Sequence, residues 1–144
     1  MPAGPRDRAA GNAPLELVLL APVLLALFGL MLAAGRTALA QGSVQAAARD
    51  AARQASIART PQQAVAAATA SAQAELASEG LHCSPAPVVR VDVTGFGVPV
   101  GQPASVRAAV SCQVPLSDLA VPGLPGRKTL QASFTSPLDP YRGR

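Results

Sequence analysis

The sequence predicts an α+β fold in which one long N-terminal helix spans a membrane and continues outside it. A second helix and then a small antiparallel sheet of about three strands are expected to follow. An uncharged apolar run extends from Leu17 to Gly35, and about 19 residues make a helix of roughly 28 Å, close to the thickness of the bilayer hydrocarbon. An alanine-rich stretch with strong helix propensity comes next. After Pro87, apolar residues alternate with polar ones, as they do in half-buried strands.

The apolar run has a polar segment before it and a charge directly after it. Residues 1–11 form a leader with Arg6 and Arg8, and Arg36 is the first charged residue beyond the run. We interpret residues 12–35 as a transmembrane anchor. Because cations concentrate on the cytoplasmic side of membrane spans, the leader arginines place the N-terminus in the cytoplasm. A single-pass protein of the cell membrane is expected, with an extracytoplasmic C-terminal domain.

Residues 36–80 are expected to form an extracytoplasmic helical region. Its first part prolongs the anchor helix, and Gly42-Ser43 interrupts the alanine-rich sequence in a way that permits a bend. Thr60 is a suitable N-cap for a second helix, and Pro61 suits the first position of that helix. Gly80 suits the position just past its C-terminal end.

Residues 81–136 are expected to form the small β region, and residues 137–144 a flexible tail. The alternation of apolar and polar side chains predicts a sheet with one buried face. Segment 95–103 is rich in glycine and proline and predicts a turn, whereas segment 115–128 has too many of them to be regular. The alternating runs are Val89 to Val93, Val106 to Val114 and Leu130 to Phe134.

The two cysteines, Cys83 and Cys112, both fall in the part of the chain expected outside the membrane. A single pair in an oxidising compartment favours a disulfide. It would close a loop of about 30 residues and stabilise the domain by roughly 3 kcal/mol. The alternative is two unpaired or metal-binding thiols. His82 adjoins Cys83, but these two residues with one distant cysteine lack the spacing and the number of ligands of a zinc site.

Glu16 is a lone carboxylate at the start of the apolar run, where a charge that faces lipid is costly. Its G-x-x-x-x-E spacing from Gly11, at the mouth of an N-terminal hydrophobic helix, resembles the leader of prepilins and pseudopilins. The resemblance implies that a prepilin-type peptidase cuts the bond between Gly11 and Asn12. It also implies an assembly role for Glu16, which would neutralise the new N-terminal amine of a neighbouring subunit.

The string A-A-A-R-D-A-A-R, from Ala46 to Arg53, adds to this resemblance. An alanine- and arginine-rich segment directly after an N-terminal anchor is similar to that of TadE-like proteins, the minor pseudopilins of bacterial tight-adherence (Flp) pilus systems. The family implies a structural or assembly role in such a pilus or a related secretion system. The implied partners are the lipid bilayer, other pilin or pseudopilin subunits, the pilus assembly machinery and the prepilin-type peptidase. Taken alone, the string also fits a solvated helix.

Two other readings of the N-terminus stay open. Ala38 and Ala40 precede Gln41 in an A-x-A pattern, which fits a signal peptidase site and a small secreted protein released after Ala40. Against this reading, the apolar run exceeds the usual length of a signal-peptide core, and Arg36 intervenes before the site. The other reading is an uncleaved anchor that tethers a binding domain to the membrane.

The sequence predicts that the chain is not an enzyme. It also predicts that the chain binds no cofactor, metal or nucleic acid. One His and eight dispersed carboxylates support neither a catalytic triad nor a paired acid–base site. The sequence has no glycine-rich phosphate loop. The formal net charge of +4 comes from scattered arginines without interleaved aromatic residues, unlike a nucleic-acid-binding patch.

Overall fold

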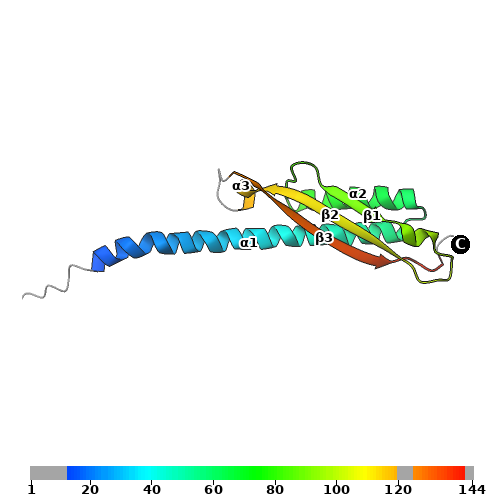
Figure 1. Ribbon diagram of the computed structural model, residues 1–144, viewed down its shortest axis with the longest axis horizontal. Coiled ribbons are helices and arrows are strands. Elements are labelled where there is room, and N and C mark those ends of the chain that lie inside the picture. The colour runs from blue at the N-terminus through cyan, green and yellow to red at the C-terminus, as the bar shows by residue number, and fades with distance from the viewer. Residues whose placement is uncertain (1–12, 120–124, 142–144) are drawn as a thin grey trace, which may run out of the picture.

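The computed structural model describes residues 13–119 and 125–141, except for the side chains of residues 13–16. Figure 1 shows a long helical rod, with a second helix and a sheet gathered along its C-terminal half. This arrangement of a long apolar helix, a second helix and a three-stranded antiparallel sheet confirms the predicted α+β fold. The elements are α1 (Ala13–Ile57), α2 (Pro61–Ser78), β1 (Val88–Asp92), the 3-10 helix η2 (Thr94–Gly97), β2 (Ser105–Pro115), α3 (Leu116–Leu119) and β3 (Arg127–Pro137).

Helix α1 is one uninterrupted helix of 45 residues, which at 1.5 Å per residue is about 67 Å long. Its sequence permits a bend at Gly42-Ser43, but Figure 1 shows a continuous helix there. The Ser43 hydroxyl donates a hydrogen bond to the Leu39 carbonyl oxygen one turn earlier, at 3.2 Å. Alanine-rich sequence on both sides supplies the helix propensity, and packing against the rest of the protein holds this part of α1 in place.

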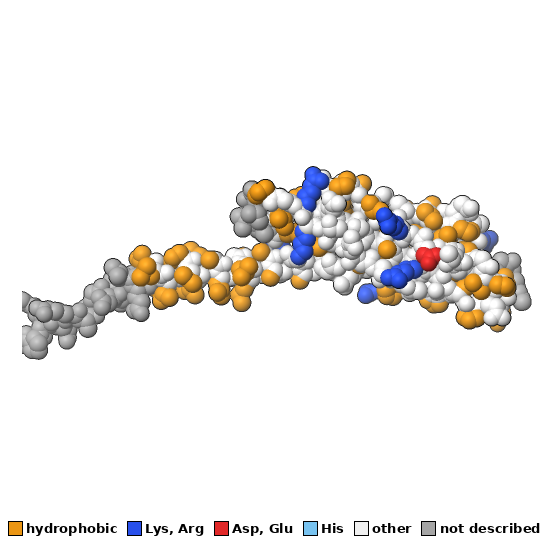
Figure 2. Space-filling model, viewed as in Figure 1, with side chains coloured by type: hydrophobic (Ala, Val, Ile, Leu, Met, Phe, Trp, Pro, Cys, Tyr) orange, Lys and Arg blue, Asp and Glu red, His pale blue; other side chains and the backbone are white. Residues whose placement is uncertain are grey.

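The N-terminal half of α1 projects from the body and exposes apolar side chains along its length, as the orange side chains of Figure 2 show. Every large hydrophobic side chain from Leu17 to Leu32 is between 51% and 71% exposed. The most apolar 18-residue window of the helix has a mean hydropathy of 2.7. By length and composition α1 can cross a membrane. An apolar surface of this extent is unfavourable in water, so the helix indicates a single-pass membrane protein.

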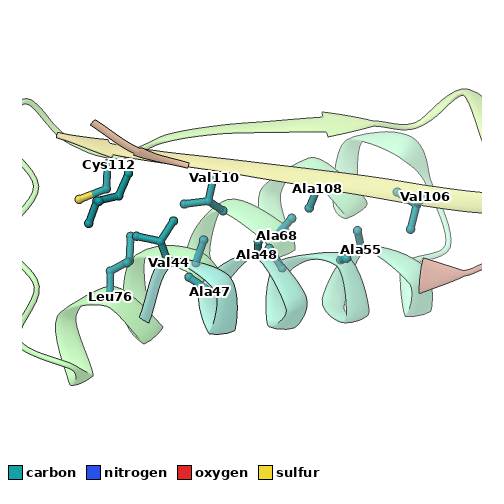
Figure 3. Packing of buried hydrophobic residues seen from close by; sticks show 14 of the residues in the cluster. Val44, Ala47, Ala48, Ala55, Ala68, Leu76, Val106, Ala108, Val110 and Cys112 are labelled. Carbon is teal, nitrogen blue, oxygen red and sulfur yellow. The ribbon is translucent and has the colours of Figure 1, made fainter. Parts of the chain in front are cut away.

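The C-terminal half of α1 packs against α2 mainly through alanine. The buried side chains of α2 recur every four residues, which places them on one face of the helix. Small side chains on both helices let the two backbones approach closely. Figure 3 shows side chains of the two helices, among them Ala48 and Ala68, gathered beneath the sheet. The buried residues of both helices form one group. They are Val44, Ala47, Ala48, Ala51, Ala52 and Ala55 of α1 and Ala64, Ala68, Ala72 and Leu76 of α2.

The ends of α2 are capped as the sequence predicts. Thr60 is the N-cap, and its hydroxyl accepts a hydrogen bond from the Gln63 backbone N–H at 3.2 Å. Pro61 is the first residue of the helix. Gly80 follows the helix with a φ of +67°, a left-handed conformation that glycine adopts without steric cost. The backbone N–H of Leu81 then donates to the Leu76 carbonyl oxygen at 2.9 Å and turns the chain toward β1.

The sheet has the order β1-β2-β3, and each strand is antiparallel to its neighbour. The central strand β2 buries every second side chain, from Val106 to Val114. In the register of the sheet, Val110 lies between Val89 of β1 and Ala132 of β3. The buried face of the sheet packs on α1 and α2, so the body has one layer of helix and one layer of sheet (Figure 3).

The prediction that segment 115–128 is wholly irregular was wrong at its two ends. Pro115 is the last residue of β2, one turn of helix α3 follows, and Arg127 opens β3. The strands extend beyond the alternating apolar runs because Pro115 still pairs with Arg127. Proline is tolerated there because β1 pairs with β2 only as far as Ser111, so its missing N–H breaks no hydrogen bond to β1. Residues 120–124 lie outside the described part of the chain.

The body also continues past the boundary at which the sequence places a tail. Pro137 is the last residue of β3, and Leu138 is only 3% exposed. The Leu138 N–H donates to the Ala104 carbonyl oxygen at 2.9 Å, and the Gly101 N–H donates to the Pro140 carbonyl oxygen at 2.9 Å. A single leucine between proline and aspartate has no periodicity, which is why the sequence pattern does not include it in the core.

Replacing Ala68 with leucine is expected to lower the free energy of unfolding by about 1–3 kcal/mol, because the added carbons must separate helices already packed through alanine. Ala70→Leu on the exposed side of α2 is the matched control and should change stability by less than about 0.5 kcal/mol. Urea unfolding of the detergent-solubilised protein, followed by circular dichroism, measures both. Equal effects of the two substitutions would contradict close packing of α1 on α2.

Candidate functional site

The residues that the sequence assigns to processing lie at the start of α1 or before it. Gly11 and Asn12 are outside the described residues. Glu16 falls in the first turn of α1, which begins at Ala13. Glu16 therefore lies at the N-terminal end of the apolar half of α1.

The string from Ala46 to Arg53 is divided between a buried and an exposed face of α1. Its alanines at 47, 48, 51 and 52 are buried in the hydrophobic core that α1 shares with α2 and the sheet. Asp50 accepts a hydrogen bond from the hydroxyl of Ser71 on α2. Arg49 and Arg53 are exposed on the opposite face. The alternation of alanine pairs with arginine thus gives one helix both a contact with α2 and a basic outer stripe.

Two side chains of α1 hold strand β3. The Gln41 amide donates a hydrogen bond to the Gln131 carbonyl oxygen at 2.9 Å. The Arg49 guanidinium lies over the Phe134 ring, 5.5 Å from its centroid, at a cation–π distance. Phe134 is on the buried face by its register but is 40% exposed, because β3 is an edge strand. Neither contact carries a sequence signal, since Gln41 and Gln131 are far apart in the chain.

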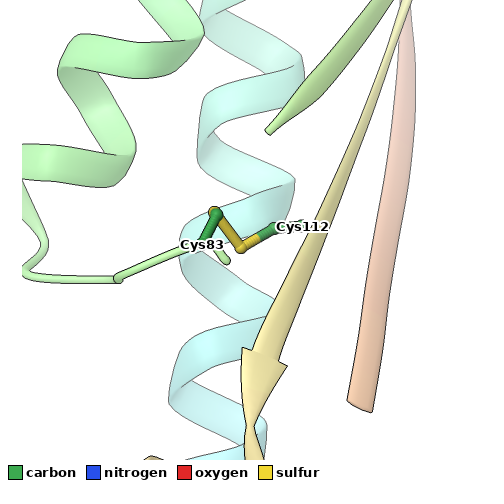
Figure 4. Close-up of a disulfide and its surroundings, with 2 residues drawn as sticks. All are labelled: Cys83 and Cys112. Carbon is green, nitrogen blue, oxygen red and sulfur yellow. A yellow bond between two sulfur atoms is a disulfide. The ribbon is translucent and has the colours of Figure 1, made fainter. Parts of the chain in front are cut away.

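The structure joins Cys83 and Cys112 in a disulfide, with 5.2 Å between the two Cα atoms (Figure 4). Cys112 is fully buried on the inner face of β2, opposite Leu130. The next residue after Cys83, Ser84, donates its backbone N–H to the Gln113 carbonyl oxygen at 2.9 Å. The disulfide therefore ties the connector that follows α2 to the central strand of the sheet.

The alternative signal peptidase site lies in the middle of α1. Ala38 is exposed, whereas Ala40 is 6% exposed and belongs to the hydrophobic core of the body. Cleavage after Ala40 would remove this residue from the core and leave Gln41 at a free N-terminus. Residues on both sides of that bond therefore hold the fold together, Ala40 in the core and Gln41 through its hydrogen bond to β3.

The titratable side chains of the described residues are spread over the body. Within this part of the chain no three His, Cys, Asp or Glu residues gather in a metal-binding group. His82 is exposed. Hydrogen bonds from the backbone and side chain of Thr94, with a smaller contribution from the charge of Arg107, hold the pKa of Asp92 below its ordinary value. This carboxylate stabilises a turn after β1. The expectation that the chain is not an enzyme stays a prediction.

Comparison with known families gives one match. Residues 11–53 match the family model described as TadE-like protein. The match confirms the TadE-like resemblance and takes in the residues on which it rests, from Gly11 through the apolar run to Arg53. It covers less than a third of the chain, and α2 and the sheet lie outside it. No curated protein and no solved structure matches the chain.

Replacing both cysteines, Cys83→Ala with Cys112→Ala, is expected to lower the free energy of unfolding by about 3 kcal/mol. The crosslink joins cysteines 29 residues apart in sequence and so restricts the unfolded chain. Without it the unfolded chain regains that conformational entropy. Denaturant unfolding with and without a reductant measures the effect: reductant should weaken the wild type and leave the double variant unchanged. Alkylation of both cysteines in unreduced, exported protein would contradict the disulfide.

Proposed function

We propose that this chain, which carries a TadE-like segment over residues 11–53, is a membrane-anchored minor pseudopilin. It acts as a structural or assembly component of a bacterial tight-adherence pilus or a related secretion system. The family match supports a component associated with a Tad pilus, and it is the observation that carries the proposal. The role as a minor pseudopilin is inferred from the leader, the anchor and the body together.

The proposed topology has the leader in the cytoplasm and the body outside. Arg6 and Arg8 lie before the apolar run, where cations favour the cytoplasmic side. The pair Cys83 and Cys112 supports the same orientation, because structural disulfides persist in oxidising compartments outside the cytoplasm. The anchor would thus present the body, with α2 and the sheet, to other pilin or pseudopilin subunits.

The proposed role of Glu16 follows from the cost of charge in the membrane. Cleavage after Gly11 would leave a cationic amine on Asn12, next to the N-terminal end of the membrane-spanning half of α1. On insertion scales an unpaired charge at the centre of the bilayer costs about 2.5–3.5 kcal/mol, and this value is an upper bound for charges at the start of the apolar run. Pairing the amine of one subunit with the Glu16 carboxylate of its neighbour reduces that cost and sets the register of the two anchors. A prepilin-type peptidase and the pilus assembly machinery are the partners that this mechanism requires.

Two other functions have less support. A secreted protein released after Ala40 would lose a core residue of the body and would leave Glu16 without a role. An uncleaved tether for a binding domain fits the anchor but gives no reason for the match to a TadE-like model. A catalytic function has no support from the residues described, and we propose a structural role in its place.

Glu16→Ala is expected to leave membrane insertion intact and to abolish incorporation into the assembly, because the amine of a neighbouring subunit loses its partner. Asp92→Asn, which removes an exposed carboxylate from the sheet, is the matched control and should assemble normally. Membrane fractionation followed by co-purification with sheared pili or the assembly complex measures both properties. Normal incorporation of the Glu16 variant would count against the pseudopilin role.

A further inference from the structure

We propose that the body binds the headgroup of a phospholipid in a groove beside the point at which α1 leaves the membrane. This base groove has a volume of about 650 Å³. The proposal depends on α1 spanning a bilayer and is independent of a role in a pilus. The groove is lined by α1 between Arg36 and Ala46, by the segment from Glu79 to His82 after α2, and by Val114, Asp118 and Leu119.

The position of the base groove follows from the continuity of α1. Arg36 is the first charged residue after the apolar run and marks the boundary of the hydrocarbon. Ala40, only about 6 Å farther along the helix axis, is already part of the core of the body. No linker separates anchor and body, since α1 is one helix through this region. The groove therefore opens at the level of the lipid headgroups.

The apolar lining of the base groove suits the glycerol and upper acyl region of a lipid. Leu39, Leu81 and Leu119 line it from three different segments. Leu39 is 74% exposed, although it lies next to the buried Ala40. A lipid molecule in the groove would cover this side chain. The groove is also within the range of about 300–1,000 Å³ that is usual for sites of small molecules.

The charged lining contains both signs. The Arg36 guanidinium offers a planar set of donors that suits a phosphate group. Glu79 and Asp118 offer carboxylate oxygens to an ammonium group, and one oxygen of Asp118 also accepts from the Ser117 hydroxyl at 3.1 Å. A phosphoethanolamine headgroup carries a phosphate and an ammonium group, whereas a phosphoglycerol headgroup carries only the phosphate. The charges therefore favour phosphatidylethanolamine.

Gly42 keeps the base groove open. It lines the groove together with Ala38 and Ala46 of the same helix. A Cβ atom added at Gly42 would meet no atom within 4 Å, so a larger side chain there would enter the groove without striking the backbone. Leucine also has a higher helix propensity than glycine, so Gly42→Leu should fill the groove and preserve α1.

The test uses the full-length protein in nanodiscs of phosphatidylethanolamine and phosphatidylglycerol, with a photoreactive diazirine on a fraction of the phosphatidylethanolamine headgroups. Lipid adducts are expected on peptides that contain residues 36–46, 79–82 and 114–119. Gly42→Leu should lower this labelling by about tenfold, because the pocket is filled. Gly29→Leu is the matched control: its added side chain also meets open space but lies in the apolar half of α1, so labelling should not change.

Arg36→Ala gives a second, independent variant and should lower labelling by both photoreactive phosphatidylethanolamine and photoreactive phosphatidylglycerol. Glu79→Gln combined with Asp118→Asn should remove only the preference for phosphatidylethanolamine. Labelling that is spread evenly over the body, or that persists in Gly42→Leu and Arg36→Ala, would overturn the proposal. Crosslinks from the groove to a second protein chain in place of lipid would also overturn it, in favour of a protein occupant.

Discussion

The continuity of α1 across Arg36 is the constraint on which the rest of the structure depends. The same helix is an apolar rod before this residue and the central support of the body after it. Because a helix transmits its direction and rotation, the lipid-exposed half and the half bound by α2 and β3 cannot turn independently. Any contact that the anchor makes in the membrane therefore also orients the sheet, which a flexible linker would not do.

The body is stabilised by close packing of small side chains more than by large hydrophobic residues. Alanines dominate the contact between α1 and α2, and valines of β2 cover them from the sheet side. Small side chains bury little apolar area each, so a domain of this size benefits from a crosslink. The disulfide between Cys83 and Cys112 connects the end of the helical hairpin to the middle strand and supplies that crosslink.

The fold was predictable where the sequence has a strong local pattern. The apolar run, the alternation along β2 and the caps at Thr60 and Gly80 all have short-range physical causes. The contacts that hold β3 were not predictable, because Gln41 reaches Gln131 and Arg49 reaches Phe134 across the tertiary structure. The extension of β3 to Pro137 and the burial of Leu138 were missed for the same reason. The base groove also depends on three segments that only the folded chain brings together.

The N-terminus of the protein extracted from its native membrane is the most direct test of the pseudopilin role. Intact mass and terminal sequencing identify it without any substitution in the chain. A start at Asn12 is the result that this role predicts, since the peptidase would cut after Gly11 and leave α1 with Glu16 in its first turn. A start at Gln41 would identify a released, secreted domain, and an intact leader would identify a simple membrane tether. Either of these results would contradict the role.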